Sequence, residues 1–371
     1  MESTSKITTH ERAQWSSDWQ FILTCIGYAV GLGRAFLIPY LICSFIVGLP
    51  LLHLEMSLGQ FSQSGTAVEL DGSAMSLIVS VYYNVILAWV LIYLWTIVTG
   101  RSGEWASCRN EYNTIWINLK VALALAIAWT LTGLVLVKGV KMMGKISYFT
   151  ATIPYVIIVI LFIRGITLDG ASIGLDYYIF HPDFSVILDP VTWRAAATQV
   201  CYSLSVGFGG ILSLSSYNPR THNCYRDAFI ITMADGFMSI FGGTAVFSVL
   251  GFMSKQLNAK IQTVVQSGTG LAFIAYPEAM SRMPLPWLWS FLFFLMLFIL
   301  GISSQFGLAE VMITAIYDQF PAVRPYRGWL AVGVCGSLFL VGLIMCTRVS
   351  FYGTLQYLCT LIKLDIIKFI S

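Results

Sequence analysis

Hydrophobic residues form long runs along most of the chain, and short polar stretches separate these runs. Seven runs hold about 18 residues or more, close to the ~20 residues that cross a bilayer as a helix. They cover residues 76–99, 118–137, 146–163, 190–216, 228–253, 284–317 and 328–346. Further apolar segments at 21–33, 36–58 and 349–370 bring the expected number of helical segments to nine or ten. The pattern predicts an all-α polytopic membrane protein.

A polar stretch precedes the first apolar segment, and we interpret residues 1–19 as a cytoplasmic N-terminal tail. No small-residue cleavage site follows it, which argues against a signal peptide. Residues 20–371 are predicted to form a single transmembrane domain, because no soluble domain interrupts the apolar segments. Composition agrees, since 57% of the residues are hydrophobic and only 11% are charged, too few to cover a soluble globule of this length.

Positive residues gather in three alternate connections between the apolar runs. The positive-inside rule places such connections in the cytoplasm. We therefore expect a multi-pass protein with a cytoplasmic N-terminus. The clusters are Lys138, Lys141 and Lys145 in one loop, Arg220 and Arg226 in the next alternate loop, and Arg324 and Arg327 in the third.

Glycine-rich interruptions occur in two apolar segments, at residues 27–33 and 203–210. Either one alone is also typical of close helix packing through small residues. Two in one chain favour broken helices, which at membrane depth are buried in protein or line a cavity and point to midplane substrate and ion sites.

Polar side chains inside the apolar runs are further candidates, because such groups are costly in a bilayer. Ser303 and Ser304 lie in an otherwise apolar helix, where hydroxyls commonly bond back to the preceding turn. Glu55 and Asp235 lie inside or near the end of apolar spans, and each carboxylate needs a partner, a proton or an ion.

Catalytic and metal-binding patterns are missing from the sequence. Its four histidines are scattered, without a paired Cys/His spacing or a nucleophile motif. Most of the eight cysteines lie in apolar runs, where the expected role is that of a small buried hydrophobe. We therefore expect that the protein is not an enzyme.

Several motifs, in a consistent order, resemble the neurotransmitter:sodium symporter family, whose members carry amino acids, GABA and monoamines. The motifs are Gly27 to Gly33, Ile38-Pro39-Tyr40, Glu55 to Gln60, Tyr82-Tyr83-Asn84, Ser216-Tyr217-Asn218, Asn223 to Asp227, and the helix from Gly301 to Pro321. The resemblance implies the inverted-repeat sodium-symporter fold, with interrupted first and sixth helices and alternating access around a central site.

The resemblance implies two sodium sites built from oxygen ligands, which suit an alkali cation. The first would use the backbone carbonyls of Gly27, Val30 and Leu300 and the hydroxyls of Ser303 and Ser304. The second would use Ala29, Ser203 and Asp235. The asparagine that family members carry just after Leu-Gly is replaced here by Arg34, so the second set lacks one ligand.

A chloride site of the eukaryotic members maps onto Tyr40, Gln199, Ser203 and Ser239, with Asp235 in place of a neighbouring asparagine. An ionised carboxylate there would repel chloride and neutralise a nearby cation. Chloride therefore stays open as a cofactor beside sodium, and local charge balance favours weak or absent chloride dependence.

The substrate site implied by the resemblance suits a neutral amino acid, because Gly31 leaves room for a carboxylate where monoamine carriers place an aspartate. Tyr83 would donate a hydroxyl, and Glu55 would brace the broken sixth helix by accepting its freed backbone N–H groups. The remaining substrate residues are Ala29, Tyr202, Ser205 and Phe208. The cytoplasmic gate would comprise Arg12, Trp15, Tyr217 and Asp318.

Two departures from the family pattern accompany these matches. Gly33 runs through Arg34 straight into Ala35, and the chain leaves the pattern after Leu358, so the fold is expected to be incomplete at the first helix and at the C-terminus.

The predicted function is sodium-coupled symport of a neutral amino acid or a related small zwitterion across the plasma membrane. The alternative is a transport-incompetent shortened isoform that associates with full-length relatives and regulates them. The expected partners are the substrate, sodium and the lipid bilayer. We also expect that the chain can form a homo-oligomer and that it does not bind nucleic acid.

Overall fold

The computed structural model describes residues 36–63, 70–101, 119–180, 187–259 and 276–346, together with Ile261 and Phe273. Helices and their connections make up this part of the chain, which contains no strand. The predicted first apolar segment, the tail before it and the segment after residue 346 lie outside the described residues.

The helices differ widely in length, and short elements alternate with long ones along the chain. In chain order they are α2 (Leu37–Cys43), the π-helix η1 (Ser44–Gly48), α3 (Leu49–Ser62), α4 (Leu70–Val98), α5 (Leu119–Val137), α6 (Val140–Ile166), α7 (Ala171–Leu175), the π-helix η4 (Asp176–Phe180), α8 (Pro190–Ser203), α9 (Gly210–Ser215), α10 (Cys224–Leu257), α12 (Tyr276–Ser281), α13 (Pro286–Gln319), the 3₁₀-helix η7 (Pro321–Tyr326) and α14 (Arg327–Met345).

Seven helical stretches among the described residues are long and apolar enough to cross a membrane. The polytopic all-α prediction is therefore confirmed. The spans are Leu37–Ser62, Ser76–Val98, Leu119–Val137, Met142–Ile166, Cys224–Leu257, Pro286–Gln319 and Ala322–Met345.

Several predicted boundaries differ from the observed ones. The positive cluster at 138–145 does not lie in one loop, because α6 already begins at Val140 and includes Lys141 and Lys145. The run at 190–216 forms two short helices instead of one span. Lysines can lie in the first turns of a helix as well as in a loop, so the charge cluster alone could not locate the start of α6.

Local capping explains where two of the later helices begin. Asp189 caps α8, since its carboxylate accepts a hydrogen bond from the backbone N–H of Val191 at 3.0 Å. Asn223 caps α10 in the same way through the N–H of Arg226 at 3.1 Å. Such side chains satisfy backbone donors that the first turn of a helix leaves free.

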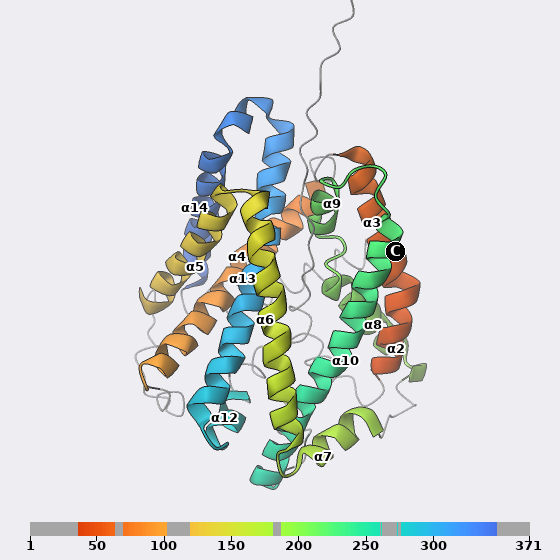
Figure 1. Cartoon of the computed structure of the whole chain (residues 1–371), viewed down its shortest axis with the longest axis vertical. Coiled ribbons are helices and arrows are strands. Elements are labelled where there is room, and N and C mark those ends of the chain that lie inside the picture. The colour runs from red at the N-terminus through yellow and green to blue at the C-terminus, as the bar shows by residue number, and fades with distance from the viewer. Residues whose placement is uncertain are drawn as a thin grey trace, which may run out of the picture.

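Two groups of helices are visible in Figure 1, with α4, α5, α13 and α14 on the left and α2, α3, α8 and α10 on the right. Each group is built around buried hydrophobic side chains, and α13 contributes to both cores. The end of α3, α9 and the start of α14 lie toward the upper end of the view, and α7 and α12 lie at the lower end. The break between α8 and α9 thus falls between the two ends of the bundle.

Close helix approach depends on glycine at the junction of α7 and α10. A Cβ at Gly174 would lie 1.7 Å from the carbonyl oxygen of Phe247. Only a residue without a side chain allows the two backbones to come this near.

Candidate functional site

The helix break between α8 and α9 is the centre of the candidate site. Helix α8 ends at Ser203, α9 begins at Gly210, and three of the residues between them have positive φ: Ser205 (54°), Gly207 (86°) and Gly209 (72°). A non-glycine residue in this region is uncommon and strained. The break therefore interrupts the helical hydrogen bonds at membrane depth, where backbone groups need other partners.

Two side chains from other helices bind the backbone of the break. The carboxylate of Glu55 on α3 accepts the N–H of Gly207 at 2.6 Å. The hydroxyl of Ser76 on α4 donates to the carbonyl oxygen of Phe208. Glu55 is buried, so its charge is placed against a donor that the helix break has released.

A second cluster surrounds Asp235, which is 1% exposed in the middle of α10. Its carboxylate accepts hydrogen bonds from the hydroxyls of Tyr40, at 2.7 Å, and Ser203. Ser239 lies one turn along α10, and its hydroxyl is 3.3 Å from that of Tyr40. Gln199 is buried one turn before Ser203 on α8, and its amide finds no partner among the described residues. The structure thus brings together side chains that were predicted separately for sodium and for chloride.

The third cluster joins α13 to α4. The hydroxyl of Ser303 bonds back to the carbonyl oxygen of Leu300 at 2.8 Å, and the Tyr83 side chain lies beside that of Ser304. Gly301 lies beside them, since a Cβ there would be 3.5 Å from the Tyr83 hydroxyl. The predicted ligands of the first sodium site therefore adjoin a predicted substrate ligand.

Aromatic rings lie next to the break. The rings of Tyr202 and Phe208 meet edge to face, with centroids 5.5 Å apart. Phe208 is buried, whereas Tyr202 and Ser205 are half-buried. These three predicted substrate residues come from the end of α8 and the break that follows it, so they are close together in the chain.

At the end of α9, Tyr217 is buried and donates to the carboxylate of Glu310 at 3.3 Å. The hydroxyl of Thr314 lies 3.1 Å from that of Tyr217. Arg327, the first residue of α14, forms an ion pair with the same carboxylate of Glu310. The predicted gate residue Asp318 lies two turns beyond Glu310 on α13 and is half-buried.

Sequence reasoning missed Glu310 as a site residue and placed Arg327 only in a positive loop. The signal was present, because an acidic residue inside the apolar run 284–317 is a functional candidate by the rule that selected Glu55 and Asp235. The partner of Glu310 could not be found from the sequence, because the turn through η7 is what brings Arg327 to it.

Comparison with known proteins adds the decisive observation. The family model of the sodium:neurotransmitter symporter family matches residues 12–117 and 115–364. The chain belongs to the sodium:neurotransmitter symporter family.

Relatives in this symporter family include the sodium-dependent transporter snf-5 of Caenorhabditis elegans, 34% identical over 92% of the chain and 61% of that protein. The mouse sodium- and chloride-dependent neutral and basic amino acid transporter B(0+) is 36% identical over 92% of the chain and 68% of that protein. The bovine sodium- and chloride-dependent GABA transporter 2 is 35% identical with the same two coverages. The chain therefore spans about three fifths to two thirds of the length of these symporters.

A solved structure shows the same fold. The crystal structure of MhsT in complex with L-phenylalanine superposes with a TM-score of 0.71 over 90% of this chain and 80% of MhsT, at 24% sequence identity. This agreement confirms the predicted sodium-symporter fold, and the break between α8 and α9 is the predicted interruption of the sixth helix.

The first-helix residues that this symporter family is expected to use lie outside the described part of the chain. The structure accordingly places only the predicted site residues that lie between α2 and α14, among them the whole set predicted for chloride. The residues outside are Arg12, Trp15, Gly27, Ala29, Val30 and Gly31.

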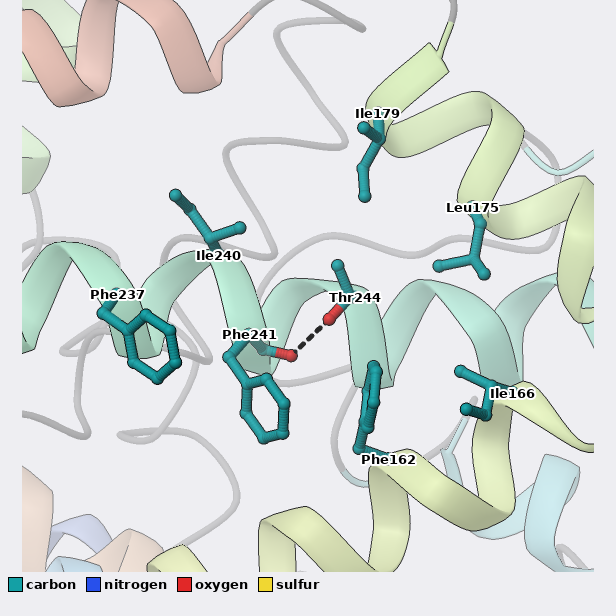
Figure 2. A pocket seen from close by; sticks show the side chains of 8 residues that line it. All are labelled: Phe162, Ile166, Leu175, Ile179, Phe237, Ile240, Phe241 and Thr244. Carbon is teal, nitrogen blue, oxygen red and sulfur yellow. Dashed lines mark hydrogen bonds between the residues drawn. The ribbon is translucent and has the colours of Figure 1, made fainter.

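A cavity of about 380 Å³ lies apart from these symporter clusters, between α6, α10 and the segment formed by α7 and η4. Figure 2 shows that apolar side chains line it, while the hydroxyl of Thr244 bonds to the carbonyl oxygen of Phe241 at 2.6 Å. None of the predicted site residues lines this cavity. Its apolar walls offer nothing to bind a zwitterion.

Proposed function

We propose that the chain is a sodium-coupled symporter of a neutral amino acid or a related small zwitterion in the plasma membrane. The observation that carries the proposal is a helix broken between Ser203 and Gly210, with Glu55 and Ser76 bound to its backbone and Asp235 bound to the residue where α8 ends. Secondary transporters use such breaks to bind substrates and coupling ions near the bilayer midplane.

The first ion site would combine the carbonyl of Leu300 and the hydroxyls of Ser303 and Ser304 with carbonyls from Gly27 and Val30. Ser303 already orients its hydroxyl toward Leu300 at 2.8 Å, so the two oxygens lie close enough to share one cation. Oxygen ligands without a fixed charge suit a monovalent alkali ion, which is bound for a transport cycle and then released.

The second ion site would combine Ser203 and Asp235 with Ala29. The hydroxyl of Ser203 already binds the Asp235 carboxylate, which supplies the negative charge that offsets a buried cation. We propose that this carboxylate also substitutes for the chloride on which the mouse and bovine relatives depend, with Tyr40, Gln199 and Ser239 completing its surroundings.

The substrate would lie between the break and Tyr83. Freed backbone N–H groups and the positive end of a half-helix favour a carboxylate, and the absence of a side chain at Gly31 leaves room for it. Tyr83 would add a hydroxyl, while Tyr202, Ser205 and Phe208 would contact the substrate's side chain. A polar end that binds the carboxylate and a largely apolar surface for an uncharged side chain match a neutral amino acid.

A cytoplasmic gate would close the path from this site. Tyr217 and Asp318 would act with Arg12 and Trp15, as the family resemblance implies. The ion pair of Glu310 with Arg327 lies directly against Tyr217, so we include both residues in the gate.

Binding of a labelled panel of neutral amino acids to purified protein, in sodium and in potassium, tests the proposal. Sodium-dependent binding that is lost in Ser304→Ala and kept in Ser290→Ala is expected. Ser290 is the matched control, because it is a buried serine on the same helix, outside the three clusters. Folded protein that binds no member of the panel would favour the alternative, a chain that regulates full-length relatives.

A further inference from the structure

A buried amide links two helices that supply different ligands of the proposed site. The side-chain nitrogen of Gln305 on α13 donates to the hydroxyl of Ser80 at 2.6 Å and to the backbone carbonyl of Ser80 at 3.2 Å. Both residues are fully buried, with 0% exposure. In a low-dielectric interior, losing such a contact leaves polar groups unsatisfied, which is costly.

The contacts next to this amide continue in register along both helices. Tyr83, one turn beyond Ser80 on α4, lies beside Ser304 on α13. Leu87, one turn further, faces Gly301, where a Cβ would lie 2.4 Å from a Leu87 methyl carbon. Rising numbers on α4 meet falling numbers on α13, so the helices are antiparallel and any slip between them would displace every contact of the series.

Donation to two acceptors makes Gln305 suited to fixing that register. Because both acceptors belong to Ser80, the two bonds together hold the Gln305 side chain at one position along α4. An apolar contact would tolerate sliding, because dispersion forces have no preferred direction.

We infer that Gln305 is a positioning residue that couples substrate binding to sodium binding. It acts by holding the Tyr83 hydroxyl against Ser304. The inference rests on the proposed function, in which Tyr83 contacts the substrate and Ser304 contacts sodium. A cation at Ser304 then orders the hydroxyl that the substrate uses, and by linkage the substrate strengthens sodium binding by the same factor.

The coupling factor, meaning the ratio of substrate dissociation constants in potassium and in saturating sodium, tests this role. Gln305→Leu removes the amide while keeping both proposed ligands. The coupling factor is expected to fall about five- to tenfold, at the lower end of typical coupling between sites. In a Tyr83→Phe background the same substitution should change the factor by less than about twofold, because the hydroxyl that Gln305 positions is gone.

Gln60→Leu is the matched control. Gln60 is buried on α3, and its side-chain nitrogen likewise donates to two oxygens, the carbonyls of Arg220 at 3.0 Å and His222 at 2.7 Å. Its loss also removes a two-bond clamp, here between α3 and the loop that precedes α10, outside the three clusters. The control should lower thermal stability while leaving the coupling factor within about twofold of wild type.

Ser80→Ala is a milder second variant, which removes only the hydroxyl acceptor and keeps the carbonyl acceptor. A fall of about twofold in the coupling factor is expected from the weaker clamp. An unchanged factor in both Gln305→Leu and Ser80→Ala, or an equal loss in Gln60→Leu, overturns the inference while the proposed function stands. Wild-type protein that binds no substrate in sodium overturns both.

Discussion

The hydroxyl of Tyr40 on α2 donates a hydrogen bond of 2.7 Å to the carboxylate of Asp235 on α10. The contact joins two residues that are 195 positions apart in the chain. Ser203 at the end of α8 donates to the other carboxylate oxygen. Three helices therefore converge on one buried acidic group, which occupies the place where the family resemblance implies an anion.

Asp235→Asn should make substrate binding depend on chloride. The amide keeps the shape of the side chain but removes the negative charge that we propose as the substitute for chloride. Binding of the labelled substrate would be measured in sodium chloride and in sodium gluconate. We expect wild type to bind alike in both salts, and the variant to bind more tightly in chloride by about tenfold, the size of a typical coupling between sites.

Asp169→Asn serves as the control for the Asp235→Asn substitution. Asp169 is exposed and pairs with Lys255 at 2.5 Å outside the three clusters, so its loss should leave the salt preference unchanged. A wild type that already requires chloride, with no change in Asp235→Asn, would contradict the proposed charge substitution.

Replacement of Glu55 by leucine should destabilise the helix break. The N–H of Gly207 loses its acceptor, and a buried unsatisfied donor costs about 1–3 kcal/mol. Glu55→Gln keeps a carbonyl acceptor and should recover most of the loss. Thermal unfolding in detergent measures the effect, and equal stability of the leucine and glutamine variants would show that the bond to Gly207 contributes little.

The ion pair of Glu310 with Arg327 leads to a test by double substitution. Removing one partner of a buried pair leaves an uncompensated charge and costs about 3–5 kcal/mol. Arg327→Met should therefore unfold at a clearly lower temperature than wild type. Glu310→Gln combined with Arg327→Met should recover part of the loss, because neither charge is then left alone. Additive losses in the double variant would argue against a direct pairing.

The sequence predicted the elements of the fold better than their contacts. Long apolar runs marked the spans, and the glycines and serines at 203–210 marked the break between α8 and α9, because each of these signals is local. The clamp of Gln305 on Ser80 joins residues 225 positions apart, and no local pattern reports which helices will be neighbours.

Some residue roles could likewise be predicted from the sequence, and others could not. Glu55 was expected to brace the broken helix, and its carboxylate accepts the N–H of Gly207 in the structure. Glu310 lies in an apolar run as Glu55 and Asp235 do, but no family motif singled it out and its partner was not visible in the sequence. Such a group becomes recognisable once Arg327 and Tyr217 are seen around it.

Gly301→Ala should shift Tyr83 away from Ser304 and weaken substrate binding. The added Cβ would lie 2.4 Å from a Leu87 methyl carbon and 3.5 Å from the Tyr83 hydroxyl, so the Leu87 side chain must move within a packed core, and overpacking of this kind costs about 1–3 kcal/mol. Leu87→Ala in the same chain makes room for the methyl group and should restore binding. The measurement is sodium-dependent substrate affinity in the two single variants and in the double variant. Recovery in the double variant would assign the defect to this steric contact, whereas a double variant no better than Gly301→Ala would show that the glycine acts through its backbone alone.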